Sequence, residues 1–265
     1  MARDPYSAKF TGRYKMEYIR VTKDNLEKEH ICCAIADEKD AQVLSKKTWL
    51  RKRFDDGLVF LKGNVRGKCF IEYIPAENAW APIEAEGYLY IDCLWVSGSL
   101  KGHGYANDLL NACMEDGRKN KKKGLVILSS EKKEGFLADR KFLEHKGFTI
   151  ADRSDPHFLL MYLPFTENAE KPHFGFSVKD MRPTADGYVL YYTDQCPFTA
   201  KYVPLLKKTA EENGVLLKTV HIDTKEEAQA APCPFTTFVL YKGGRFITHE
   251  IQSPPKFLKI IEKIQ

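Results

Sequence analysis

The sequence predicts an α/β (α+β) protein of two parts, a larger mixed domain followed by a small βαβαββα domain. Continuous apolar runs, typical of strands buried on both faces, alternate with amphipathic segments of helical periodicity. Prolines and glycines interrupt this pattern at residues 166–186. The stretch of about 80 residues that follows is long enough for one small core. We therefore expect domains at residues 1–165 and 187–265, joined by a linker at 166–186.

The elements of the first domain follow from local patterning. Apolar residues spaced by three or four predict helices, and short β-branched or aromatic runs predict strands. Strands are expected at residues 16–21, 58–61, 68–74, 88–96, 125–129 and 157–163, and helices at 24–35, 40–54, 105–117 and 139–144. The run at 88–96 is almost wholly apolar, so it predicts a strand in the middle of the sheet.

The second domain repeats this logic over fewer residues. Strands are expected at residues 188–192, 215–222, 236–241 and 245–250, and helices at 197–212, 224–230 and 255–264. Pro197 would occupy the first position of its helix, where proline is favoured because its missing N–H has no partner to lose. The last two strands predict a terminal hairpin.

Composition narrows the classes of function. The 265 residues contain no apolar run of the roughly 20 residues that cross a bilayer, and no secretory signal at the start. The seven cysteines are odd in number, and they form neither a CxxC pair nor a zinc-type spacing. The net charge of +5 lies mostly in local runs. We expect a cytoplasmic protein with no structural metal, no nucleic-acid partner and no membrane partner. The oligomeric state stays open.

The most informative segment is a strand, a glycine-rich turn and a helix at residues 91–106. Gly102 and Gly104 allow the backbone to approach phosphate oxygens, and the helix N-terminus offers unpaired amides to a diphosphate. Neither a Rossmann fingerprint, whose third glycine is replaced by Ala106, nor a Walker loop is present. A strand–helix turn without any ligand is the alternative interpretation.

This segment resembles the acetyl-CoA loop of the GNAT superfamily of N-acetyltransferases. The family pattern Arg/Gln-x-x-Gly-x-Gly/Ala follows a strand of the type Ile-Glu-x-Leu-x-Val, and residues 91–96 and 101–104 are similar to it. Residues 142–148 resemble the family's helix and Gly-Phe ending. Ser99 stands where the family carries Arg or Gln, and Lys101 is a candidate to replace that charge. The resemblance covers residues 16–164 and implies a splayed central sheet with flanking helices.

The resemblance also implies how acetyl-CoA would bind. The strand backbone at Leu94, Trp95 and Val96 would pair with the pantetheine arm. The loop amides would hold the diphosphate, from Lys101, Gly102, His103, Gly104, Tyr105 and Ala106. The implied reaction is direct attack by an amine of a small molecule or peptide on the thioester.

Catalytic candidates are fewer. Asp92 falls where many family members carry a catalytic glutamate, and burial in an apolar strand would raise its pKa and suit it to act as a base. The alternative is a structural Asp that faces a polar cleft or pairs with a lysine. The family's general-acid tyrosine falls on Leu143, so the proton donor stays open among Tyr88, Tyr90 and Tyr105.

A second cluster combines acidic and aromatic residues. Glu72, Glu77 and Trp80 occupy one expected strand and the loop after it. Any one of them could line a pocket for a cationic amine. The plainer interpretation is a hairpin with one packed face.

Cys196 lies between a strand and a helix of the second domain, where a helix N-terminus favours the thiolate. With Pro204 eight residues later, this part resembles the thioredoxin fold, although Thr199 replaces the second cysteine of the motif. If Pro234 takes the place of the family's cis-proline, Cys233 would approach Cys196, and the two could form a disulfide or hold a soft metal. A redox-inactive module is the alternative.

The fusion of these two parts resembles the YoaP-like acetyltransferases. The leading hypothesis is an acetyl-CoA-dependent N-acetyltransferase with Asp92 and Cys196 as the catalytic candidates. The alternative is a coenzyme A-binding sensor or scaffold with a thiol-active second domain. A pure interaction module, which would not bind coenzyme A, is the third.

Overall fold

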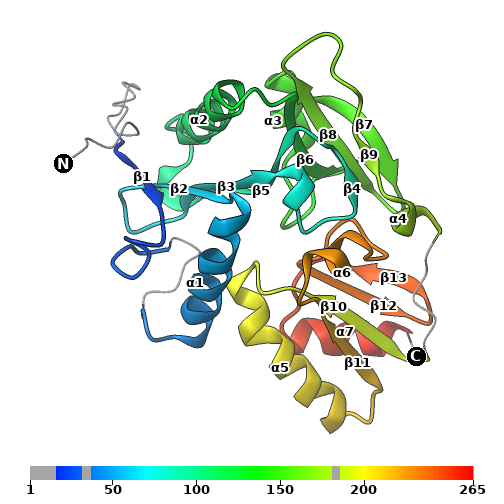
Figure 1. Cartoon of the computed structure of the whole chain (residues 1–265). Helices are drawn as coiled ribbons and strands as arrows, with labels where there is room; N and C mark the ends of the chain where they lie inside the picture. The colour runs from blue at the N-terminus through cyan, green and yellow to red at the C-terminus, as the bar shows by residue number, and fades with distance from the viewer. Residues whose placement is uncertain (1–15, 32–36, 181–185, 265) are drawn as a thin grey trace.

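The computed structural model describes residues 16–31, 37–180 and 186–264. A seven-stranded sheet and a four-stranded sheet lie next to each other (Figure 1), and β4 and β9 form a separate two-stranded sheet. The N-terminal part contains β1 (Tyr18–Val21), α1 (Ala41–Arg53), β2 (Val59–Gly63), β3 (Cys69–Pro75), β4 (Ile83–Glu84), β5 (Tyr88–Val96), α2 (Tyr105–Lys119), β6 (Gly124–Ser130), α3 (Arg140–His145), β7 (Thr149–Ser154), β8 (Phe158–Pro164), β9 (His173–Phe174) and α4 (Phe176–Asp180). The C-terminal part contains β10 (Tyr188–Tyr192), α5 (Pro197–Glu212), β11 (Leu217–His221), α6 (Lys225–Gln229), β12 (Phe238–Lys242), β13 (Arg245–Thr248) and α7 (Pro254–Ile264).

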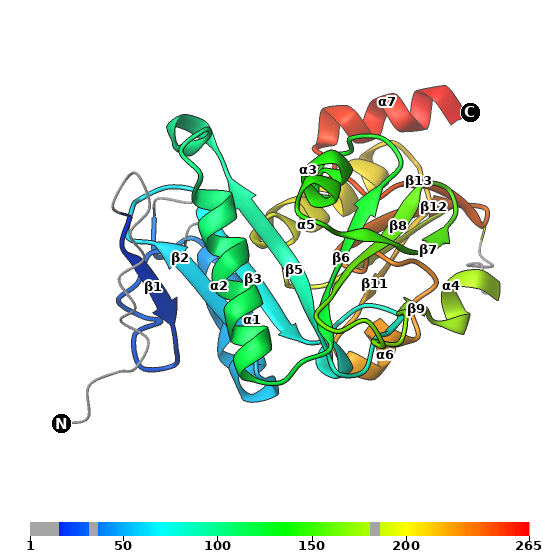
Figure 2. The same cartoon turned by 90° about the horizontal axis from the view of Figure 1, so that it is seen from above.

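The first sheet has the order β1-β2-β3-β5-β6-β8-β7 and splits in the middle. Strands β5 and β6 run parallel, but they pair only from Tyr88–Gly124 to Ile91–Ile127. Beyond that point β5 pairs only with β3, and β6 only with β8. Figure 2 shows the two strands diverging. The splayed sheet that the family resemblance implies is confirmed.

A β-bulge lies where the strands begin to diverge. Glu72 of β3 pairs with Cys93, and Tyr73 pairs with Ile91, so Asp92 is the extra residue of β5. A bulge interrupts the alternation of side chains across a strand and bends it. As a result Asp92 and Cys93, although adjacent in sequence, line the same pocket.

The two faces of the first sheet bury different partners. On one face, α2 and α3 pack Leu110 and Leu143 against the sheet. On the other face, the core around Phe70 also includes Phe235 and Val239 of the C-terminal part. One hydrophobic core therefore runs from the first sheet into the second. The C-terminal part therefore covers this face of the first sheet and contributes residues to its core.

The second sheet has the order β11-β10-β12-β13. Strands β10 and β11 are parallel, and β12 is antiparallel to both β10 and β13. Helices α5 and α7 cover its outer face through residues such as Leu206 and Phe257. The order of strands and helices in this part is the one that the sequence predicts. Among the described helices, none is both long enough and apolar enough to span a bilayer.

One local prediction is wrong, and one strand was not predicted. The helix expected at residues 24–35 is replaced by turns over its described part, and residues 32–36 lie outside the described ranges. The Asn25 side chain accepts from the Thr22 amide (2.8 Å) and donates to the Arg20 carbonyl (3.0 Å), and such local bonds compete with a helix. Strand β7 was not expected, because this edge strand is polar and lacks apolar alternation.

Candidate active site

The glycine-rich turn leads from β5 into α2. Gly102 and Gly104 adopt φ values of 81° and 86°, in the left-handed region that favours glycine. A Cβ at either position would meet no atom within 4 Å, so open space lies above this backbone. No residue in the described ranges accepts a backbone hydrogen bond from the amides of Gly102, Gly104 or Tyr105. Lys101 is exposed beside them. The turn therefore presents donors and positive charge to solvent.

The edge of β5 that faces β6 is open beyond Ile91. In the described sheets, no strand pairs with this edge at Leu94, Trp95 and Val96. Their peptide groups can thus pair with an extended ligand as a further strand would. The turn and the open edge are continuous along the chain, so a single long ligand could contact both.

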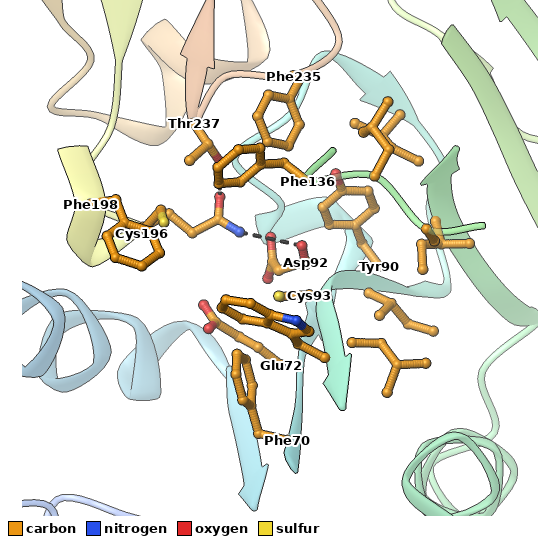
Figure 3. Close-up of a pocket in the computed structure, with 18 of the residues that line it drawn as sticks. Phe70, Glu72, Tyr90, Asp92, Cys93, Phe136, Cys196, Phe198, Phe235 and Thr237 are labelled. Carbon is orange, nitrogen blue, oxygen red and sulfur yellow. Dashed lines mark hydrogen bonds between the residues drawn. The ribbon is translucent and has the colours of Figure 1, made fainter. Parts of the chain in front are cut away.

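A cavity of about 360 Å³ lies where the two strands diverge. Its lining comes from α1, β3, β5, β6 and the loop before α3, and also from the start of α5 and the segment before β12. Figure 3 shows Asp92 and Cys93 from the first sheet facing Cys196, Phe235 and Thr237 from the C-terminal part. The cavity is therefore shared between the two halves of the chain.

A buried ion pair joins these halves beside the cavity. Lys46 Nζ donates to Glu72 Oε2 (2.5 Å) and to the backbone carbonyl of Gln195 (2.7 Å). Trp49 Nε1 donates to the other carboxylate oxygen of Glu72 (3.3 Å). The Lys46 and Glu72 side chains are 2% and 1% exposed. The two buried charges neutralise one another. Because Lys46 also binds the Gln195 carbonyl, the pair fixes α1, β3 and the segment before α5 relative to one another around the cavity.

Asp92 is the second carboxyl group in the cavity. Burial raises its pKa well above the ordinary value, and the negative charge of Glu72 raises it further, while Lys46 opposes the shift. The Gln195 side-chain amide contacts the Asp92 carbonyl (3.5 Å), and Thr237 Oγ1 donates to the Gln195 side chain (2.9 Å). A carboxylate with a raised pKa is a stronger base once it has ionised.

The structure distinguishes the three candidate tyrosines. The Tyr88 hydroxyl donates to the Glu170 carbonyl (2.6 Å), away from the cavity, and Tyr105 is the first residue of α2, next to the glycine-rich turn. Tyr90 lines the cavity (Figure 3), and burial raises the pKa of its hydroxyl well above the ordinary value. Leu143, at the family's tyrosine position, is fully buried under the sheet.

The acidic and aromatic cluster is only partly brought together. Glu72 lines the cavity, but Glu77 pairs with Lys122 (2.9 Å) outside it. Trp80 is buried beneath the Arg53 guanidinium, which lies 4.6 Å from its ring. Of the three candidates for an amine pocket, Glu72 lines this cavity, and Glu77 and Trp80 do not.

The cysteines of the C-terminal part lie in different environments. Cys196 caps α5 and lines the cavity, and burial raises the pKa of its thiol to about 11. Cys233 is buried outside the lining, and burial raises its pKa to about 12. Both thiols are free. The peptide bond before Pro234 is trans, so this proline does not take the place of a cis-proline.

Sequence reasoning missed several residues of the cavity, among them Lys46, Phe198 and Phe235. Lys46 had a signal, because it lies on the same helical face as the apolar residues Val43 and Leu50. A lysine on an apolar face needs a buried partner. Phe198 and Phe235 had no such signal, since aromatic residues are ordinary in a core.

Comparison with known proteins decides the family. A family model described as YoaP-like matches residues 217–259. The protein named "Uncharacterized N-acetyltransferase YoaP" of Bacillus subtilis (strain 168) is 42% identical over 250 residues, which span 94% of this chain and 100% of the relative. The chain belongs to the YoaP family of N-acetyltransferases. Because the match covers 94% of this chain, it extends over both the N-terminal and the C-terminal part.

Solved structures resemble this YoaP-family chain more distantly. A GNAT family acetyltransferase from Brucella melitensis, in complex with acetyl-CoA, has 12% identity and a TM-score of 0.38, covering 59% of this chain and 92% of that one. Ard1 from Thermoplasma volcanium has 11% identity and a TM-score of 0.38, covering 57% and 99%. The family assignment rests on the YoaP relative.

Proposed function

We propose that this chain transfers the acetyl group of acetyl-CoA to the amine of a small molecule, in the cavity between the two sheets. One observation carries the proposal. The open edge of β5, at Leu94 to Val96, leads into a cavity that contains Asp92. A strand edge that can pair with a pantetheine arm and a carboxyl that can act as a base are thus adjacent.

The residues present fit acetyl-CoA. Gly102 and Gly104 leave open space over amides at the start of α2, which suits a diphosphate, and Lys101 adds a positive charge. The peptide groups of Leu94 and Val96 lie on the unpaired strand edge, which suits the amides of pantetheine. Bound acetyl-CoA supplies an acetyl group activated as a thioester.

Two side chains then handle the protons. Asp92 accepts a proton from the substrate ammonium, which frees the nitrogen lone pair to attack the acetyl carbon. The Tyr90 hydroxyl donates a proton to the departing sulfur, and the second proton released by the nitrogen on amide formation replaces it. A C–N bond forms, a C–S bond breaks, and one net proton leaves through Asp92. The raised pKa of Tyr90 keeps its hydroxyl protonated at neutral pH.

Cys196 takes a different part in this proposal. Its pKa of about 11 leaves the thiol protonated at neutral pH, which disfavours a covalent role. We assign it to the cavity wall. We also propose that the second sheet is a thioredoxin-like scaffold, supported by the order β11-β10-β12-β13 and by Cys196 at the start of α5. The free thiols of the described cysteines favour a cytoplasmic location.

The test begins with calorimetric titration of the protein with coenzyme A. Acetyl-CoA is then mixed with a panel of amines, and free thiol is followed with a chromogenic reagent. Asp92→Asn should abolish most amine-dependent thiol release, whereas Glu77→Gln, a carboxyl change outside the cavity, should leave it intact. No heat with coenzyme A would refute the proposal. Binding without thiol release across the panel would leave only a coenzyme A-binding protein.

A further inference from the structure

The C-terminal part supplies one side of the cavity through Gln195, Cys196, Phe198, Phe235 and Thr237. It is also fastened there. Lys46 donates to the Gln195 carbonyl, and the Gln195 side chain contacts the backbone of the residue proposed as the base. Because these residues line the cavity together with Asp92, they lie where they would contact the molecule that carries the amine.

The charges of the cavity define what can enter. Two carboxyl groups, Glu72 and Asp92, line it. Lys46 is the one cation that the described residues contribute to the lining, and its ammonium already binds Glu72 and the Gln195 carbonyl. A carboxylate or phosphate on the substrate would therefore be buried beside acids with no cation to pair with, which is costly. An ammonium group would meet Asp92.

The shape and chemistry of the remaining lining define the rest of the molecule. Aromatic rings line the cavity from both halves, namely Phe70, Tyr90, Trp95, Phe136, Phe198 and Phe235. The volume of about 360 Å³ is near the lower end for ligand sites, and the tip of acetyl-CoA would take part of it. What is left suits a compact apolar body and is too small for a folded peptide segment.

The rim of the cavity carries a strained aromatic residue. Phe136 has φ of 65°, a conformation that bulky residues rarely adopt, and the residue is 48% exposed. Its neighbour Gly135 donates to Glu250 Oε1 (2.9 Å), and the Gly135 carbonyl lies 2.9 Å from His249 Nε2. The C-terminal part thus holds this loop, and with it the Phe136 ring, over the cavity.

Resting on the proposed function, we propose that the acceptor is a small primary amine with an apolar, preferably aromatic, body and no anionic group. The C-terminal part selects it, with Phe198 and Phe235 contacting the body while Asp92 faces the nitrogen. The C-terminal part then determines which acceptor the acetyltransferase accepts, and this role explains why it packs against the first sheet.

A matched pair of substrates tests the charge argument. 2-Phenylethylamine and phenylalanine share the same ring and amine, and differ by one carboxylate. With the full-length protein and saturating acetyl-CoA, we expect kcat/KM for 2-phenylethylamine to exceed that for phenylalanine by on the order of 100-fold, since the buried carboxylate would have no partner. Butylamine, without a ring, should fall between them.

Matched variants of α5 test the role of the C-terminal part. Phe198→Ala should lower kcat/KM for 2-phenylethylamine about tenfold without changing KM for acetyl-CoA. Leu205→Ala, a change on the same helix at a residue that is 39% exposed and outside the cavity, should have no effect. Phe198→Arg adds a cation to the cavity lining. It should lower the ratio of kcat/KM for 2-phenylethylamine to kcat/KM for phenylalanine, whereas misfolding would lower both values alike.

The outcomes separate this proposal from the proposed function. If the protein acetylates phenylalanine or another anionic amine as well as 2-phenylethylamine, the charge argument is overturned while the acetyltransferase stands. If Phe198→Ala leaves kcat/KM for 2-phenylethylamine unchanged, and Phe198→Arg leaves the ratio between the two substrates unchanged, the C-terminal part does not select the acceptor. If coenzyme A neither binds nor is released with any amine, the proposed function fails, and this proposal fails with it.

Discussion

The buried pair of Lys46 and Glu72 gives a prediction whose size follows from the structure. The two side chains are 2% and 1% exposed and meet at 2.5 Å. Lys46→Met removes the ammonium, and among the described residues it leaves the Glu72 carboxylate with the Trp49 indole N–H as its one side-chain donor. Breaking a buried ion pair by removing one partner costs about 3–5 kcal/mol, because an unpaired charge stays buried.

This loss should be visible as a fall in thermal stability. Unfolding entropy of about 2.1 cal/mol/K per residue gives about 0.56 kcal/mol/K for 265 residues, so the midpoint should fall by about 5–9 °C. Circular dichroism during a thermal scan measures it. The double variant Lys46→Met with Glu72→Leu should recover most of the loss, because it leaves no buried charge.

The neighbouring residue provides the control. Lys47 lies on the same helix, and its partner Glu38 (2.9 Å) has a side chain that is 46% exposed. Water can solvate that carboxylate when the lysine is removed, so Lys47→Met should cost at most about 1 kcal/mol. If Lys46→Met loses no more stability than Lys47→Met, or the double variant is no more stable than the single one, the pair does not hold the cavity walls as argued.

Further predictions concern the chemistry. Tyr90→Phe should lower kcat by on the order of 100-fold at unchanged KM for acetyl-CoA. Tyr88→Phe should not lower kcat, because the Tyr88 hydroxyl points away from the cavity. If steady-state assays find the same kcat for Tyr90→Phe as for the unaltered protein, Tyr90 is not the proton donor. Because the pKa of Asp92 is raised, its basic form appears as pH rises, so kcat/KM should increase through that pKa, and Asp92→Asn should remove this limb of the pH–rate profile. The raised pKa also means that the neutral form stabilises the fold at low pH and that this stability is lost as pH rises through the folded-state pKa, so urea titrations should find Asp92→Asn the more stable at high pH. Gly104→Ala should weaken coenzyme A binding about tenfold in calorimetry, because φ of 86° strains alanine; an unchanged Kd would contradict the loop assignment. The Cys196 thiol, with a pKa of about 11, should react with iodoacetamide at pH 7.5 more slowly than a free cysteine, and rapid labelling would overturn its assignment as a wall residue.

Local sequence patterns predicted a large part of this fold. The strand, turn and helix around Gly102 and Gly104 could be predicted because a left-handed backbone and a helix start are properties of neighbouring residues. The order of elements in the C-terminal part could be predicted for the same reason. The helix expected at 24–35 failed where the Asn25 side chain bonded the backbone instead, a competition that periodicity does not register.

The candidate site was harder to reach, because its parts are far apart in sequence. Asp92 was found from a family resemblance, but its place beside Cys93 on one face depends on a bulge that only pairing with β3 reveals. Tyr90 could not be ranked above Tyr88 until their hydroxyls were located. Lys46 meets Gln195 across 149 positions of chain.

The sequence by itself determined most of the strands and helices, and the glycine-rich turn at the start of α2, since these depend on nearest neighbours along the chain. Tertiary structure alone decided that the two sheets share a core and that a second set of aromatic residues closes the cavity. Hydrophobic burial is not directional, so an apolar run predicts that a segment is buried but not which segment it packs against. The partner is settled only when the whole chain has packed.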